Sequence, residues 1–184
     1  LLMINYKLFA TLLLAATSMS LSATERDTIC IDKGWMFHRG DISEVSQLKS
    51  AMQAQGEAVN LPHDFQISQD WVAPDASERP DNSDAGSNVR SRLSPRGFKE
   101  MGIGWYRYEL TPKEEWKGKR IVLDFQGIML VGDVYLNGQR IGGTDYGYLG
   151  MDADISKLLK YGQVNEIAVK ADTRNPNNSR WYTG

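Results

Sequence analysis

The 184-residue chain has little cysteine, histidine or proline: one Cys, two His and six Pro. With Cys30 as its only cysteine, it cannot form an internal disulfide, so the fold must depend on a hydrophobic core. We interpret Cys30 as a small buried residue on a first strand. A catalytic thiol is not indicated, because no histidine lies near Cys30 and only His38 and His63 exist. No His/Cys/Asp spacing suits zinc either.

The chain also lacks an excess of either charge. Its formal net charge is -2, with 21 Lys and Arg against 23 Asp and Glu. No basic field is therefore available to attract nucleic acid or an anionic membrane surface. Nucleic acid is not an expected partner.

No hydrophobic run is long enough to span a bilayer. The apolar run from Leu8 to Ala16 follows Met3 and the positive Lys7, and small residues suited to cleavage come next. This pattern is typical of a secretory signal peptide, which we assign to residues 1–23. A lipid anchor would need a cysteine directly after the cleavage site, and Cys30 comes too late. We therefore expect a periplasmic or secreted protein.

Recognisable catalytic motifs are missing as well. The chain has no glycine-rich phosphate loop and no serine in a nucleophile-elbow pattern. A glycosidase needs two carboxylates that flank the bond, and no such pair stands out. The candidate carboxylates each have a plainer interpretation on strand surfaces or at bends: Asp64, Glu100, Glu109, Asp124, Asp133 and Asp145. A binding surface is the interpretation that remains.

What is present is a pattern of short alternating segments. The dipeptide Asn137-Gly138 predicts a tight hairpin, because Asn and Gly accept positive φ. Only residues 43–56 show helical spacing, with Gly56 as a stop, and a short helical turn is expected from Met151 onward. Several short strands separated by Gly or Pro turns predict an all-β, antiparallel sandwich. The residues expected on inward strand faces are Tyr106, Tyr108, Leu110, Ile121, Leu123, Phe125, Ile167, Val169 and Ala171.

Polar and aromatic loops are the candidates for a binding surface. They are "LPHDF", "GTDYGYLG" and "DTRNPNNSRWYTG". Such mixtures suit sugars, because hydroxyls bond to Asp, Asn and Arg while C–H faces stack on rings. Plainer alternatives are that "LPHDF" only places Phe65 in the core, and that Tyr146 and Tyr148 are core or edge rings. Residues 72–98 form a long polar stretch, interpreted as an exposed loop.

The stretches "NLPHDF", "GIGWYRYEL", "VLDFQGIMLVGDVYLNGQRIGGTDYGY", "DISKLLKYGQVNEIAVKADT" and "NSRWYTG", in this order, resemble the N-terminal domain of glycoside hydrolase family 2. That family includes β-galactosidases, β-glucuronidases and β-mannosidases, and the chain looks most similar to the β-galactosidases. The resemblance covers Gly34 to Gly184 apart from the long polar loop. It implies a jelly-roll β-sandwich of the galactose-binding-domain-like type over residues 24–184.

The same resemblance implies domains beyond this chain. In the family, an immunoglobulin-like domain and a (β/α)₈ barrel follow, and the barrel carries the two catalytic glutamates of a retaining mechanism. These domains are the expected partners, with a β-galactoside as the sugar, and family members are often homo-oligomers. We expect no catalytic residue within this chain, so the chain alone should be inactive. The alternative is a free-standing carbohydrate-binding or adhesion module without enzyme activity.

The last loop of the domain helps to close the sugar subsite in family β-galactosidases. By resemblance this role falls on Asn178, with Asp172, Asn177 and Arg180 as neighbours that share it. For Arg180 and Trp181, packing against a neighbouring domain is the alternative. Some members carry Asp in place of Asn178 and bind a sodium ion there. An Asn would weaken such a site through loss of charge, so a sodium or magnesium ion is expected only in the full-length enzyme.

Overall fold

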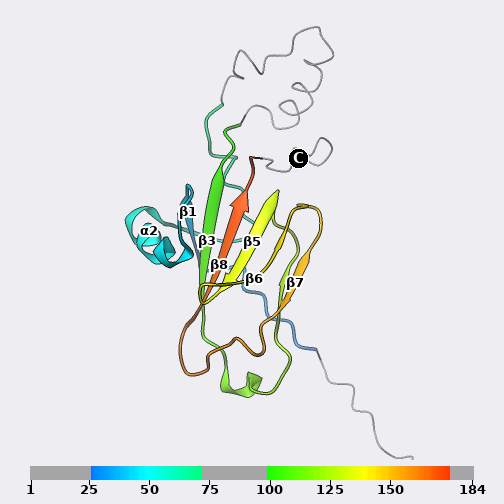
Figure 1. Cartoon of the computed structure of the whole chain (residues 1–184). Helices are drawn as coiled ribbons and strands as arrows, with labels where there is room; N and C mark the ends of the chain where they lie inside the picture. Colours follow the sequence, from blue (N-terminus) through cyan, green and yellow to red (C-terminus); the bar gives the residue numbers. More distant parts are fainter. Residues whose placement is uncertain (1–25, 72–98, 175–184) are drawn as a thin grey trace, which may run out of the picture. The chain divides into compact units, whose positions relative to one another are not determined.

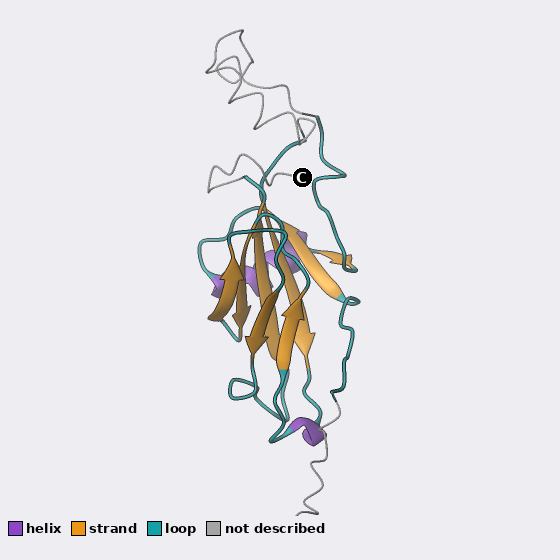
Figure 2. Cartoon of the chain, turned by 90° about the vertical axis from the view of Figure 1, so that its right-hand side faces the viewer, coloured by secondary structure: helices purple, strands orange, loops and turns teal. Residues whose placement is uncertain are grey.

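The structure is a computed structural model that describes residues 26–71 and 99–174 (Figure 1). The chain divides into two units, residues 1–30 and 31–184, and every named element lies in the second. Strands dominate this unit, as Figure 2 shows. In chain order the elements are β1 (Trp35–Arg39), η1 (Val45–Gln47), α2 (Leu48–Gln55), β2 (Glu57–Val59), β3 (Ile103–Leu110), η3 (Glu114–Trp116), β4 (Val122–Phe125), β5 (Val131–Leu136), β6 (Gln139–Thr144), β7 (Met151–Asp154) and β8 (Asn165–Asp172).

The strands form two antiparallel sheets. The larger sheet has six strands in the order β2-β1-β3-β8-β5-β6, and the smaller sheet pairs β4 with β7 (Figure 1). At the centre, β3 and β8 pair over their full length, from Ile103 opposite Asp172 to Leu110 opposite Asn165. The prediction of an all-β, antiparallel sandwich is confirmed.

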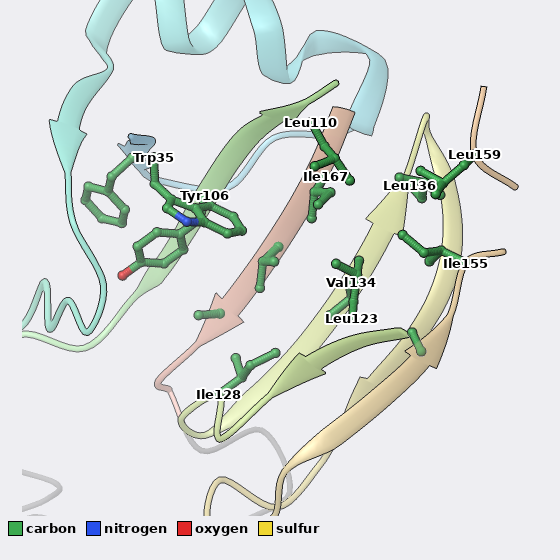
Figure 3. Close-up of a cluster of buried hydrophobic side chains, with 14 of the residues drawn as sticks. Trp35, Tyr106, Leu110, Leu123, Ile128, Val134, Leu136, Ile155, Leu159 and Ile167 are labelled. Atoms are coloured by element: carbon green, nitrogen blue, oxygen red, sulfur yellow. The ribbon is translucent and has the colours of Figure 1, made fainter. Parts of the chain in front are cut away.

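The main core lies on one face of the large sheet, and Figure 3 shows part of it. Side chains alternate along each strand, so every second residue of β3, β5 and β8 points into this core. Val134 and Ile167 are completely buried and meet Leu123 of the small sheet. Each such aliphatic side chain contributes roughly 1.5–3 kcal/mol by leaving water. All nine inward residues expected from the sequence lie in this core or pack against it.

The predicted hairpin joins β5 to β6. Asn137 has φ 51° and Gly138 has φ 82°, the left-handed conformations that a tight turn needs. The Asn137 side chain adds two bonds to β8: its Nδ2 donates to Asn165 Oδ1 at 2.9 Å, and its Oδ1 accepts from Glu166 N at 3.0 Å. The turn therefore also ties β5 to β8.

The predicted helix is confirmed as η1 followed by α2, which ends at Gly56. Leu48 and Met52 are buried in a second hydrophobic cluster with Ile103, Trp105 and Ala168. These strand residues alternate with those of the main core, so α2 covers part of the opposite face of the large sheet. No helix among residues 26–71 and 99–174 is long and apolar enough to cross a membrane.

Two expectations from the sequence are wrong. Cys30 is exposed and lies outside any strand, because β1 begins only at Trp35. Residues Met151–Asp154 form strand β7 instead of a helical turn. The helical spacing belongs to the residues after β7, where Leu158 N and Leu159 N both donate to Ile155 O. The expected loop at 72–98 lies outside the described residues.

Candidate functional site

Asp172 is the one sequence-predicted site residue that the structure describes. It ends β8 and lies opposite Ile103 of β3 on one side and Val131 of β5 on the other. In Figure 1, β8 is the red strand between β3 and β5. Asp172 therefore occupies the central position at this end of the large sheet, only a few residues before "NNSRWYTG".

Hydrogen bonds on both sides hold this end of β8 in place. Thr173 N donates to Gly102 O at 2.9 Å, and Gly102 N donates to Thr173 Oγ1 at 3.1 Å. On the other side, Leu130 N donates to Asp172 O at 3.3 Å. The segment that leads to residues 175–184 thus leaves the sheet from a fixed point.

The Asp172 carboxylate is already occupied by Arg174. Its Oδ1 accepts from the backbone N and the Nε of Arg174, both at 3.0 Å, and its Oδ2 accepts from Nη2 at 2.7 Å. The side chain of Asp172 is only 10% exposed, against 56% for Arg174. Burial raises the pKa of Asp172, but the hydrogen bonds and charge of Arg174 outweigh burial and hold that pKa below its ordinary value.

This pairing limits what Asp172 can do chemically. An ionised carboxylate bonded at both oxygens can still accept a further hydrogen bond, but it is a poor general acid. We interpret it as a group that fixes the chain at residues 172–174. The sequence analysis did not predict Arg174 as its partner, although the spacing of Asp172 and Arg174 in "DTR" was a signal for the pair.

An aromatic cluster forms where the "LPHDF" segment packs on strands β1 and β3 of the large sheet. Phe65 is 4% exposed and stacks on Phe37 of β1, with ring centroids 5.4 Å apart. His63 Nδ1 lies 3.0 Å from the Tyr106 hydroxyl. A Cβ on Gly104 would lie 2.6 Å from Phe37 and 2.9 Å from Phe65, so only glycine fits between the rings. The plainer interpretation of this motif, that it places Phe65 in the core, is confirmed.

The same cluster raises the pKa of Tyr106. Burial is the main cause, and the nearby charges of Asp64 and Glu57 add to it. The Tyr106 hydroxyl therefore stays protonated at neutral pH. At the edge of the cluster, Arg39 pairs with Glu100 at 3.2 Å and lies over the Phe65 ring.

The candidate carboxylates of the described chain mostly have structural partners. Glu109 pairs with Arg107, and Asp133 pairs with Arg140. Asp64 accepts from the backbone N of Gln66 within its own turn. Among residues 26–71 and 99–174, no group of three or more His, Cys, Asp or Glu side chains could hold a metal ion.

The remaining predicted site residues, Asn177, Asn178 and Arg180, lie outside the described residues. Their roles, and the expected cation at Asn178, stay predictions. The structure therefore brings one predicted residue, Asp172, to the end of β8 from which the others follow in the chain.

Comparison with known proteins identifies the family of the domain. Residues 103–180 match the family model of the glycosyl hydrolase 2 galactose-binding domain-like domain. The chain is 30% identical over 171 residues to a β-galactosidase from Bacteroides ovatus, covering 93% of this chain and 18% of that protein. It is 31% identical over 163 residues to a β-glucuronidase from Bacteroides fragilis, covering 88% of this chain and 19% of that protein.

A solved structure gives the same result. The crystal structure of a β-glycosidase from Bacteroides vulgatus superposes with a TM-score of 0.66 at 32% identity, over 85% of this chain and 18% of that one. The chain spans less than a fifth of each of these three relatives. The β-sandwich described here belongs to the galactose-binding domain-like domains of glycosyl hydrolase family 2.

Proposed function

We propose that this chain is the non-catalytic N-terminal domain of an exported, β-galactosidase-like enzyme that hydrolyses terminal β-galactosides with retention. The observation that carries the proposal is the likeness, over nearly the whole chain, to a β-galactosidase more than five times as long. In this proposal the catalytic glutamates lie in the part of the enzyme that follows this domain. The domain itself contributes one wall of the sugar subsite.

The position of β8 supports the proposal that this domain forms one wall of the sugar subsite. Its last residue is held between β3 and β5, so residues 175–184 follow from a rigid base. Asn178 then offers an amide to the sugar hydroxyls, with Asn177 and Arg180 beside it. In this proposal the Arg174 ion pair holds the chain at residues 172–174 instead of contacting sugar.

β-Glucuronides are the main competing substrate, because several similar proteins are named β-glucuronidases. A glucuronide adds a carboxylate at a position where a galactoside has a hydroxymethyl group. The two activities therefore differ in the charge that the subsite must accept.

The test is to assay the product of the complete reading frame with nitrophenyl β-galactoside and nitrophenyl β-glucuronide at matched concentrations. The proposal expects a higher kcat/KM for the galactoside and release of the β-anomer first in a proton NMR time course. A preference for the glucuronide would reject the substrate assignment. Release of the α-anomer first would reject retention.

A further inference from the structure

The face of the large sheet opposite the main core carries a groove beside α2. The helix covers only part of this face, and the groove of about 590 Å³ lies next to it. Such a volume is within the usual range for small-molecule sites. Its lining comes from the segment before α2, from strands β3, β5 and β8, and from the β5–β6 turn.

The floor of the groove is aromatic and rigid. The rings of Trp105 on β3 and Tyr135 on β5 lie 5.8 Å apart between centroids, at 35° to each other. Lys170 of β8 lies between these strands in the sheet, with its Nζ 5.7 Å from the Trp105 ring. Trp105 is almost completely buried, so Tyr135 is the ring that a ligand can reach. Groups on neighbouring strands hold their geometry better than groups on loops.

Three of the four charged side chains that line the groove are paired within the protein, and the fourth, the exposed Glu44, is in none of the ion pairs among the described residues. Lys170 pairs with Asp41 at 3.1 Å, and Asp133 pairs with Arg140 at 2.7 Å. Glu166 pairs with Arg107, whose side chain is only 12% exposed. An anionic ligand would have to compete with Asp41 for Lys170, the one cationic side chain in the lining. A neutral ligand can use the lone pairs that remain on the carboxylates without breaking the ion pairs.

Neutral hydrogen-bonding groups complete the lining. Ser43 and Ser46 are exposed and offer hydroxyls from the wall beside α2. Tyr135 keeps its hydroxyl proton, because burial and the charge of Asp133 raise its pKa. Asn137 offers little, since both its amide atoms bond to β8. An aromatic floor with hydroxyl and carboxylate walls matches the two surfaces of a sugar ring.

We propose that this groove binds a neutral saccharide, with Tyr135 beneath the C–H face of the sugar and Ser43, Ser46 and Asp133 bonded to its hydroxyls. The site would hold a glycan on the domain itself. The choice of a saccharide rests on membership of a glycoside hydrolase family, but not on the substrate or the subsite proposed above.

The experiment is an NMR titration of the 184-residue chain with β-1,4-galactobiose, with glucuronic acid as the charged probe. The proposal expects saturable shifts of amides in residues 42–46, 133–138 and 166–170, and weaker binding of glucuronic acid. Tyr135→Ala should weaken binding at least about tenfold, as loss of a central aromatic contact does. Ser43→Trp, which fills the groove without removing a packed side chain, should abolish it.

Trp71→Ala is the matched control, because it removes an exposed ring that does not line the groove. It should bind galactobiose as the unaltered chain does. Absence of saturable shifts, shifts that Ser43→Trp leaves unchanged, or tighter binding of glucuronic acid in the groove would overturn the proposal. Binding is measured here without hydrolysis, so failure of this inference and failure of the proposed function are distinguishable.

Discussion

Arg174 holds Asp172 at two points, with Nε 3.0 Å from Oδ1 and Nη2 2.7 Å from Oδ2. The pair stands where β8 ends between β3 and β5. It is partly buried on the carboxylate side, so its loss should matter more than the loss of a surface ion pair.

Arg174→Ala should lower the free energy of unfolding by about 1–2 kcal/mol, because a largely buried carboxylate loses charged hydrogen bonds. Urea unfolding of the 184-residue chain measures the change. Arg120→Ala is the matched control. It breaks the ion pair between Arg120 and Asp154, in which both side chains are well exposed, so the free energy of unfolding should change little. Equal effects of the two substitutions would contradict the role given to Arg174.

The same pair predicts a dependence on acid. The pKa of Asp172 is lower in the folded chain than its ordinary value of 3.8, so folding favours the ionised form. The stabilisation is therefore complete above that ordinary value and is lost as the pH falls through the folded pKa. The unfolding midpoint of Asp172→Asn should fall less than that of the unaltered chain as the pH is lowered below about 4. Parallel acid profiles would show that Asp172 carries no such stabilisation.

Gly104→Ala should lower the free energy of unfolding by about 1–3 kcal/mol, because the new methyl group would overlap the rings of Phe37 and Phe65. Gly102→Ala is the control, since a Cβ there meets only Arg39 at an ordinary 3.5 Å. Thermal and urea unfolding both report the difference. A neutral Gly104→Ala would mean that the aromatic cluster is looser than these distances indicate.

Much of the fold was predictable because its signals are local. Alternation located β3, β4 and β8, and Asn137-Gly138 located the hairpin, since each pattern reflects the backbone of a few neighbouring residues. β7 was missed because its four residues include two aspartates and are followed by Ile155, Leu158 and Leu159 at helical spacing. Cys30 was misplaced because burial depends on which sheet covers a residue, and adjacent sequence does not show that.

The candidate site was less predictable for the same reason. The resemblance pointed to Asp172 and the loop after it, but the Arg174 pair depends on side-chain geometry at the end of a strand. The outer groove was not foreseen at all. Its residues Trp105, Lys170 and Tyr135 lie on β3, β8 and β5. These strands do not follow one another in this order in the sequence and become neighbours only in the folded sheet.

Substitutions at Asn178 test the proposed subsite. In the product of the complete reading frame, Asn178→Ala should lower kcat/KM for nitrophenyl β-galactoside at least about tenfold, through loss of hydrogen bonds to the sugar. Asn178→Asp should retain more activity and make it more dependent on sodium, because a carboxylate binds a cation better than an amide does. Gln53→Ala, which removes an exposed amide on α2, is the control and should leave kcat/KM unchanged. Unchanged kinetics in both Asn178 variants would contradict the role of this residue.

The central claim is that this domain supports catalysis without performing it. The most direct measurement compares the purified 184-residue chain with the product of the complete reading frame, at equal molar concentration, on nitrophenyl β-galactoside. The account predicts turnover by the complete product and no nitrophenol above the blank from the 184-residue chain. Turnover by the 184-residue chain in a clean preparation would contradict it.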